Sequence, residues 1–152
     1  MAETISKLTI IYATETGNSQ DLAERTLDKA EELGFEAELL NAADYDVNDL
    51  SSVEALVFFG STWGEGEPPE SAWDFHDALT EGDEIDCSSL KYAVVGLGDK
   101  EYEQFCEFGK RIDAALEKHG GTRILPRKDL DAEYELGYAS WSKEFFATVE
   151  PA

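Results

Sequence analysis

Short β-rich runs alternate with stretches of helical periodicity along the whole 152-residue chain. The β-rich runs lie at 8–13, 35–40, 56–60, 92–97 and 122–125. Apolar residues recur at helical spacing at 19–33, 69–80, 106–119 and 135–149. Gly34 and Gly120 stand where helix C-caps favour glycine. Strands separated by helices run parallel with right-handed crossovers, so the sequence predicts an α/β fold.

We expect one domain over residues 1–152, built on a doubly wound, five-stranded parallel sheet with helices on both faces. The chain is 42% apolar, which is enough to form a core at this length. Doubly wound sheets bind ligands beyond the carboxyl ends of the strands, where the strand order reverses. The loops after the runs at 8–13, 56–60 and 92–97 are therefore the candidate site.

The first of these loops, residues 14–19, reads Thr-Glu-Thr-Gly-Asn-Ser and joins a predicted strand to a predicted helix. Backbone N–H groups and the macrodipole at a helix start can hold an anion. The loop matches neither the triphosphate loop nor the dinucleotide glycine pattern. It contains no Lys or Arg, so neutral donors would hold a single phosphate. Ser and Thr also cap helices for their own sake, and both interpretations stay open.

Each of the other two loops carries an aromatic residue. Trp63 is followed by Gly64 in the second loop, and Tyr102 follows Gly98 and Asp99 in the third. A flat indole or phenol ring suits stacking on a planar group. Alternatively, Trp63 anchors its own loop and Asp99 caps the next helix. Two aromatics beside a phosphate loop fit a planar cofactor with one phosphate, which is the shape of FMN.

These three motifs, in this order, resemble the flavodoxin family. Residues 14–19 are similar to its Thr-x-Thr-Gly-x-Thr/Ser phosphate signature, and 61–64 and 98–102 to its two flavin loops. The resemblance covers essentially the whole chain and is to the short-chain type. Residues 64–70 and 96–110, with the stretch 127–134, resemble more closely the FMN domain of diflavin reductases, especially the sulfite reductase flavoprotein.

The resemblance implies strand order 2-1-3-4-5 and one non-covalently bound FMN. The FMN-binding residues that it implies are Thr14, Glu15, Thr16, Gly17, Asn18, Ser19, Ser61, Thr62, Trp63, Gly64, Glu65, Leu97, Gly98, Asp99, Tyr102, Phe105 and Cys106. The first six would bind the phosphate, and Trp63 and Tyr102 would stack on opposite faces of the ring. Asp99 and the backbone near Cys106 would contact its pyrimidine edge. No catalytic residue or metal ligand is expected.

Acidic residues dominate the charge: 34 Asp and Glu against 12 Lys and Arg give −22. Such a surface repels nucleic acid and anionic membranes, so we expect neither as a partner. The stretch 30–90 carries 17 acids and no base. This clustering favours a docking face for basic redox proteins, although adaptation to a saline cytoplasm would also give an acidic protein.

The chain shows no secretory signal and no apolar run of membrane-spanning length. Its two cysteines, Cys87 and Cys106, are typical of a reduced, cytoplasmic protein. The spacing of Cys and His residues matches no structural zinc or iron–sulfur site. His76 and His119 are expected at the surface or at helix ends.

The leading hypothesis is that the protein is a low-potential one-electron carrier rather than an enzyme. We expect it to be a monomer. The chain ends at Ala152, soon after the last predicted helix, which favours a free-standing carrier. Its partners would be an NADPH-dependent flavodoxin reductase and acceptor oxidoreductases. The alternatives are the FMN domain of a diflavin reductase and a small FMN-dependent quinone reductase.

Overall fold

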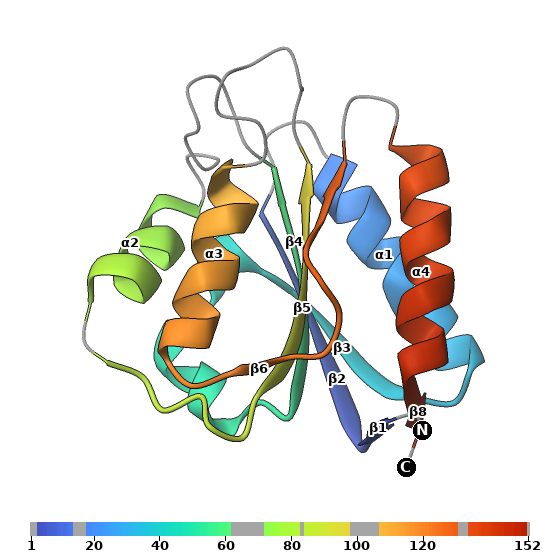
Figure 1. Ribbon diagram of the computed structural model, residues 1–152, viewed down its shortest axis with the longest axis horizontal. Helices are drawn as coiled ribbons and strands as arrows, with labels where there is room; N and C mark the ends of the chain where they lie inside the picture. Colours follow the sequence, from blue (N-terminus) through green and yellow to red (C-terminus); the bar gives the residue numbers. More distant parts are fainter. Residues whose placement is uncertain are drawn as a thin grey trace.

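A central parallel sheet separates two pairs of helices in the computed structural model (Figure 1). The structure describes residues 3–13, 18–61, 72–82, 84–97, 107–130 and 134–151. α1 (Asn18–Glu32) and α4 (Glu135–Thr148) lie on one side of the sheet. α2 (Trp73–Glu81) and α3 (Glu107–Lys118) lie on the other. The predicted α/β architecture with helices on both faces is confirmed.

The strands of this sheet are β2 (Lys7–Ala13), β3 (Glu36–Asn41), β4 (Ala55–Ser61), β5 (Lys91–Leu97), β6 (Thr122–Arg123) and β7 (Lys128–Leu130). Their order is β3-β2-β4-β5-β6, with β7 also paired to β5, and every pair is parallel. When these five strands are numbered along the chain from β2, their order in the sheet is 2-1-3-4-5, as predicted. The fifth position is divided between β6 and β7, whereas the sequence predicted one strand at 122–125.

Three described helices begin and end within one residue of their predicted ranges. α2 extends over Trp73–Glu81, and the first three residues of its predicted range, 69–71, lie outside the described residues. Gly34 and Gly120 have φ of 94° and 101°, the left-handed conformation that favours glycine at a helix C-terminus. Their N–H groups donate to the Glu31 and Glu117 carbonyls at 3.1 and 3.0 Å. Both predicted helix stops are confirmed.

Two 3-10 helices, η1 (Ala42–Asp44) and η2 (Val47–Ser52), connect β3 to β4. Asn41 and Asp46 cap them, each accepting from a backbone N–H two residues on at 2.9 Å. The sequence predicted no element here, because neither stretch is long enough to show helical periodicity. β1 (Glu3–Ile5) and β8 (Val149–Pro151) were also not predicted; they pair with each other and bring the two ends of the chain together (Figure 1).

β4 and β5 are buried on both faces, which explains their nearly continuous apolar sequences. Leu56 and Phe58 pack into a cluster with residues of α2 and α3. Val57 and Phe59 point the other way, into a cluster with residues of α1 and α4. The sheet is thus the shared wall of two apolar layers.

Candidate functional site

The strands at the centre of the sheet end level with one another. Ala13 pairs with Gly60, Gly60 with Gly96, and Gly96 with Asp129. Neighbouring strands in a sheet lie about 4.8 Å apart. Segments 14–17, 62–71 and 98–106 therefore leave the sheet from adjacent points along one edge, at the reversal of strand order. This is the edge at which the sequence predicted a ligand.

Four of the predicted site residues fall within the described structure. Asn18 is the exposed first residue of α1, and Ser19 beside it is buried. Ser61 and Leu97 are the last residues of β4 and β5 and pair with each other. The others lie outside the described residues: Thr14, Glu15, Thr16, Gly17, Thr62, Trp63, Gly64, Glu65, Gly98, Asp99, Tyr102, Phe105 and Cys106. Their contacts remain predictions.

The first cation along α1 is already neutralised. The Arg25 guanidinium donates to both carboxylate oxygens of Glu135, at 2.7 and 3.1 Å, and lies 3.0 Å from Asp21. The hydrogen bond from Arg25 lowers the pKa of Glu135. A phosphate at the start of α1 would thus depend on backbone N–H groups and hydroxyls. The described residues at this end fit a group that carries one phosphate held by neutral donors.

Tyr134 was not among the predicted site residues. Its hydroxyl donates to Oδ1 of Asn18 at 3.3 Å, which joins the entry to α4 with the start of α1. The signal was present in the sequence, since this tyrosine closes the stretch that resembles diflavin reductases. Its contact with Asn18 nevertheless depends on two segments that are far apart in the chain.

Close packing joins the ends of β4 and β5 to the start of α3. A Cβ on Gly60 would lie 2.8 Å from Phe58 and 3.0 Å from Phe108 of α3. A Cβ on Gly109 would lie 3.1 Å from the Cα of Gly96 in β5. The start of α3 therefore touches the ends of β4 and β5, and this contact sets where segment 98–106 rejoins the fold.

Comparison with known proteins identifies the fold family. Residues 10–141 match the family model described as flavodoxin. The chain belongs to the flavodoxin family. A short-chain flavodoxin associated with a non-canonical PDU bacterial microcompartment has a similar structure, with a TM-score of 0.82 at 29% identity over 95% of this chain and 97% of that one. A flavodoxin from Streptococcus pneumonia TIGR4 gives 0.78 at 26% identity, over 94% of this chain and 99% of its own.

This flavodoxin-family chain also resembles larger proteins. It is 38% identical over 144 residues to the sulfite reductase (NADPH) flavoprotein alpha-component of Vibrio cholerae, covering 95% of this chain. The protein of the same name from Bacillus subtilis is 40% identical over 141 residues, or 92% of this chain. The match covers 24% of the first relative and 23% of the second. The chain thus spans about a quarter of these relatives.

The described part of the chain shows neither a metal cluster nor a membrane-spanning helix. Within the described ranges, no group of three or more His, Cys, Asp or Glu side chains is placed to bind a metal ion. None of the described helices has the length and apolar character that crossing a bilayer requires.

Proposed function

We propose that this chain binds FMN non-covalently as a single domain over residues 1–152 and serves as a low-potential one-electron carrier. The observation that carries the proposal is the level ending of β2, β4 and β5, from which all three predicted flavin loops depart. Membership of the flavodoxin family supports it. Each of the three motifs follows the carboxyl end of one of these strands, so all three begin at the same edge of the sheet.

In this proposal the chain holds the cofactor by its two ends. Thr14, Thr16 and Ser19, with the start of α1, bind the phosphate, while Trp63 and Tyr102 enclose the ring. Bound FMN supplies reversible transfer of single electrons. The carboxylates of the surrounding surface disfavour added negative charge in the site, and this lowers the reduction potential of the bound FMN.

The partners in this proposal are redox proteins with basic faces: an NADPH-dependent flavodoxin reductase and acceptor oxidoreductases. The acidic surface supports this choice. α2 follows directly on the second predicted flavin loop, and Asp74, Asp77 and Glu81 are exposed along it, with no Lys or Arg in the helix. Opposite charges steer such partners together. In this scheme the chain is a cytoplasmic monomer and turns over no substrate of its own.

The second candidate is the FMN domain of a longer diflavin reductase. It is supported by the sulfite reductase flavoproteins, to which this chain is 38–40% identical over about a quarter of their length. The site would be the same, but electrons would arrive from a module linked to this domain. Stopped-flow reduction of the 152-residue chain by a separate NADPH-dependent reductase distinguishes the two, because a free carrier accepts electrons rapidly from an unlinked donor.

FMN binding tests the proposal directly. Titration of the apoprotein should quench flavin fluorescence at a ratio of one FMN to one chain. We expect Trp63→Ala and Tyr102→Ala each to weaken binding at least about tenfold, because each removes a stacking face. Leu33→Ala, which trims an exposed apolar residue after α1, is the matched control and should leave the affinity unchanged.

Two outcomes would contradict the proposal. A protein that stays colourless after incubation with FMN has no flavin site. A protein that oxidises NADPH by itself in the presence of a quinone, at a steady rate, is a quinone reductase rather than a carrier.

A further inference from the structure

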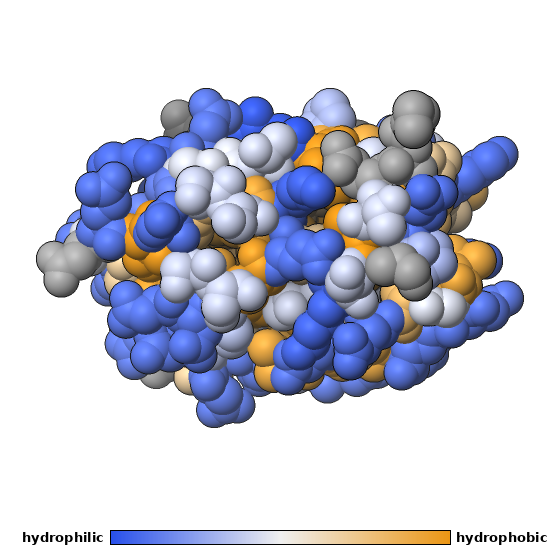
Figure 2. Space-filling model, turned by 90° about the horizontal axis from the view of Figure 1, so that it is seen from below, coloured by the Kyte–Doolittle hydropathy of each residue, from blue (hydrophilic) through white to orange (hydrophobic). Residues whose placement is uncertain are grey.

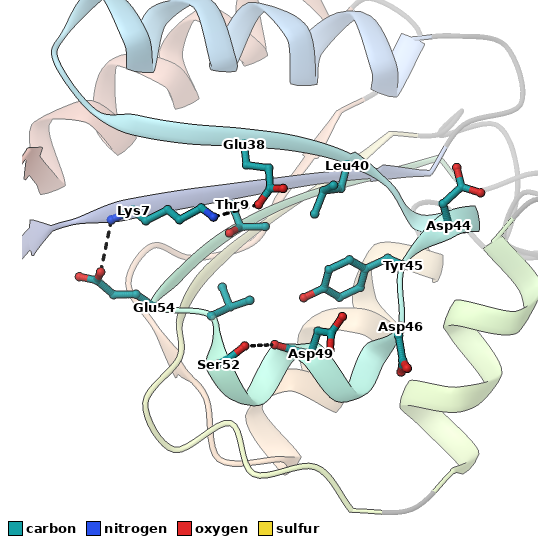
Figure 3. Close-up of a pocket in the computed structure, with 11 residues that line it drawn as sticks. Lys7, Thr9, Glu38, Leu40, Asp44, Tyr45, Asp46, Asp49, Ser52 and Glu54 are labelled. Carbon is teal, nitrogen blue, oxygen red and sulfur yellow. Dashed lines mark hydrogen bonds and ion pairs between the residues drawn. The ribbon is translucent and has the colours of Figure 1, made fainter.

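A groove outside the predicted cofactor loops lies between the strands β2 and β3 and the 3-10 helix η2 (Figure 3). Its volume is about 560 Å³, within the range of small-molecule sites. Its lining residues come from 7–9, 38–46 and 49–54. None of them belongs to the segments that the flavin site uses, so the groove is a separate feature.

The charge of the groove is strongly negative. Five carboxylates line it and Lys7 is its single base; the carboxylates belong to Glu38, Asp44, Asp46, Asp49 and Glu54. Lys7 Nζ lies 3.1 Å from Glu38, Asp46 caps η2, and Glu54 accepts from the backbone N–H groups of Ser6 and Lys7. Within the described residues, the carboxylates of Asp44 and Asp49 make no hydrogen bond or ion pair. The charge is therefore uncompensated at the end of the groove near Asp44.

Two hydroxyls of the groove also have no partner. Thr9 is 5% exposed and lines the groove, yet its hydroxyl makes no hydrogen bond within the part of the chain that is described. The buried phenol oxygen of Tyr45 likewise has no partner there. The Tyr45 oxygen is buried, so leaving it without a hydrogen bond destabilises the fold. The Thr9 hydroxyl lines the groove, where a ligand with N–H donors could bond to it.

The Tyr45 phenol is neutral over the physiological pH range. Burial, followed by the negative charges of Asp49 and Glu38, raises its pKa to about 12. It can therefore accept a hydrogen bond from an ammonium group or donate one to a neighbouring carboxylate. The same carboxylates that hold the proton on Tyr45 would attract a cation to the groove.

Apolar atoms lie between the charged groups. Leu40 and Val53 line the groove and pack against the core behind it. Lys7 shows how an alkyl ammonium fits this surface, because its side chain extends beside β2 and its amino group meets Glu38 (Figure 3). The groove thus combines carboxylates, unpartnered hydroxyls and an apolar floor.

We propose that this groove binds a linear organic polycation of the polyamine class. Its amino groups bind Asp44 and Asp49 and donate to the hydroxyls of Thr9 and Tyr45, and its methylene segments cover Leu40 and Val53. The described carboxylates form no metal-binding group of three, so spaced amines match their arrangement better than a single metal ion does. Binding here leaves the edge of the sheet that carries the flavin loops free.

Calorimetry of the full chain with spermidine, in about 150 mM salt, tests the proposal. We expect saturable binding with one site, and backbone amide shifts in NMR spectra confined to the groove around Thr9, Tyr45 and Asp49. The double variant Asp44→Asn/Asp49→Asn should bind at least about tenfold more weakly, because two charge-assisted contacts are lost. The control Asp28→Asn/Glu32→Gln makes the same change in charge on α1, across the sheet, and should change affinity less than about twofold.

Thr9→Val separates a binding role from a structural one. The substitution keeps the shape and removes an unpartnered hydroxyl, so the free energy of unfolding should stay the same or rise. The affinity for spermidine should fall about fivefold, since one hydrogen bond is lost. A loss of affinity without a loss of stability supports the proposal; unchanged affinity in this variant contradicts it.

Four further results would overturn the proposal. Binding that does not saturate would indicate a diffuse counterion atmosphere. Amide shifts spread over the acidic surface would indicate the same, as would an equal loss of affinity in the α1 control. Hexylamine, with a single amino group, should bind more weakly than spermidine, and equal affinities would exclude recognition of spaced amines.

Discussion

Tyr92 shows how a single buried side chain affects stability at high pH. It is fully buried in β5, and its hydroxyl donates to the Asp113 carbonyl of α3 at 3.3 Å. Burial, followed by the negative charge of Asp113, raises its pKa to about 12, compared with about 10 in an unfolded chain. The folded state therefore holds this proton more tightly than the unfolded state does.

We predict that the free energy of unfolding decreases as the pH rises from 10 to 12. The Tyr92 contribution is complete below pH 10, where the phenol is protonated in both states, and disappears above the folded-state pKa. Tyr92→Phe should flatten this dependence, and Tyr45, whose pKa is also raised to about 12, should account for part of what remains. Urea denaturation at pH 8 and pH 11.5 measures the difference; a slope identical to that of the unsubstituted protein would contradict the prediction.

His119 is another residue whose role follows from its surroundings. It comes directly after α3, as the expectation of a helix-end position requires, but it is only 9% exposed. Nδ1 accepts from the Ile85 N–H at 3.1 Å, and Nε2–H donates to the Leu79 carbonyl at 2.8 Å. The ring thus joins the end of α3 to the end of α2 and to the connection that leads from α2 to β5.

At the scale of elements, the contact between α3 and β5 fixes the start of α3, the helix that follows the third predicted flavin loop. Gly109 packs on Gly96 so closely that an added Cβ would lie 3.1 Å from the facing Cα. The neighbouring atom belongs to the backbone of a central strand and cannot rotate away as a flexible side chain can. A methyl group added at Gly109 would therefore displace the helix. The helix begins at Glu107, directly after segment 98–106.

We predict that Gly109→Ala destabilises the protein by about 1–2 kcal/mol and weakens FMN binding about tenfold, because it pushes the start of α3 away from the sheet. Ala114→Gly is the control. It lies on the exposed side of the same helix and should cost about 1 kcal/mol through helix propensity alone. Denaturation and flavin titration measure both effects. Equal FMN affinity in the two variants would show that helix position does not control the site.

For the molecule as a whole, charge is the dominant property. Figure 2 shows one end of the protein, where hydrophilic residues cover most of the surface and hydrophobic ones appear in smaller areas between them. The basic residues are unevenly distributed, with none in the stretch 30–90 that contains β3, β4 and α2. In the proposed function, this distribution would steer basic partners toward the surface formed by residues 30–90.

We predict that reduction by a basic-faced reductase slows with ionic strength and with loss of charge on α2. Asp74→Asn/Asp77→Asn should lower the second-order rate constant about threefold to tenfold in low salt, and the difference should shrink in about 0.5 M salt. The double variant Glu24→Gln/Asp28→Asn, at exposed positions of α1 outside the stretch 30–90, has the same net charge and should lose less. Stopped-flow measurement compares the two double variants with the unsubstituted protein. Equal rates in the two variants would mean that net charge alone, rather than a docking face, controls the reaction.

The sequence by itself determined the order and type of the main elements, because their information is local. Apolar periodicity distinguished strands from helices, and glycines at 34 and 120 marked two helix ends. The nearly continuous apolar sequences of β4 and β5 indicated strands buried on both faces. The three loop motifs then predicted a flavin site at one edge of the sheet. These features need no knowledge of distant residues.

Only the tertiary structure decided the features that depend on contacts between distant segments. β7 and the β1–β8 pair are three residues long in each strand, too short for a local pattern, and exist because a partner strand satisfies their backbone groups. The hydrogen bond from Tyr134 to Asn18 and the double role of His119 join residues that the sequence separates widely. The groove beside η2 has the same origin, since its lining includes residues of β2, β3, η1 and η2, which are separate in the sequence.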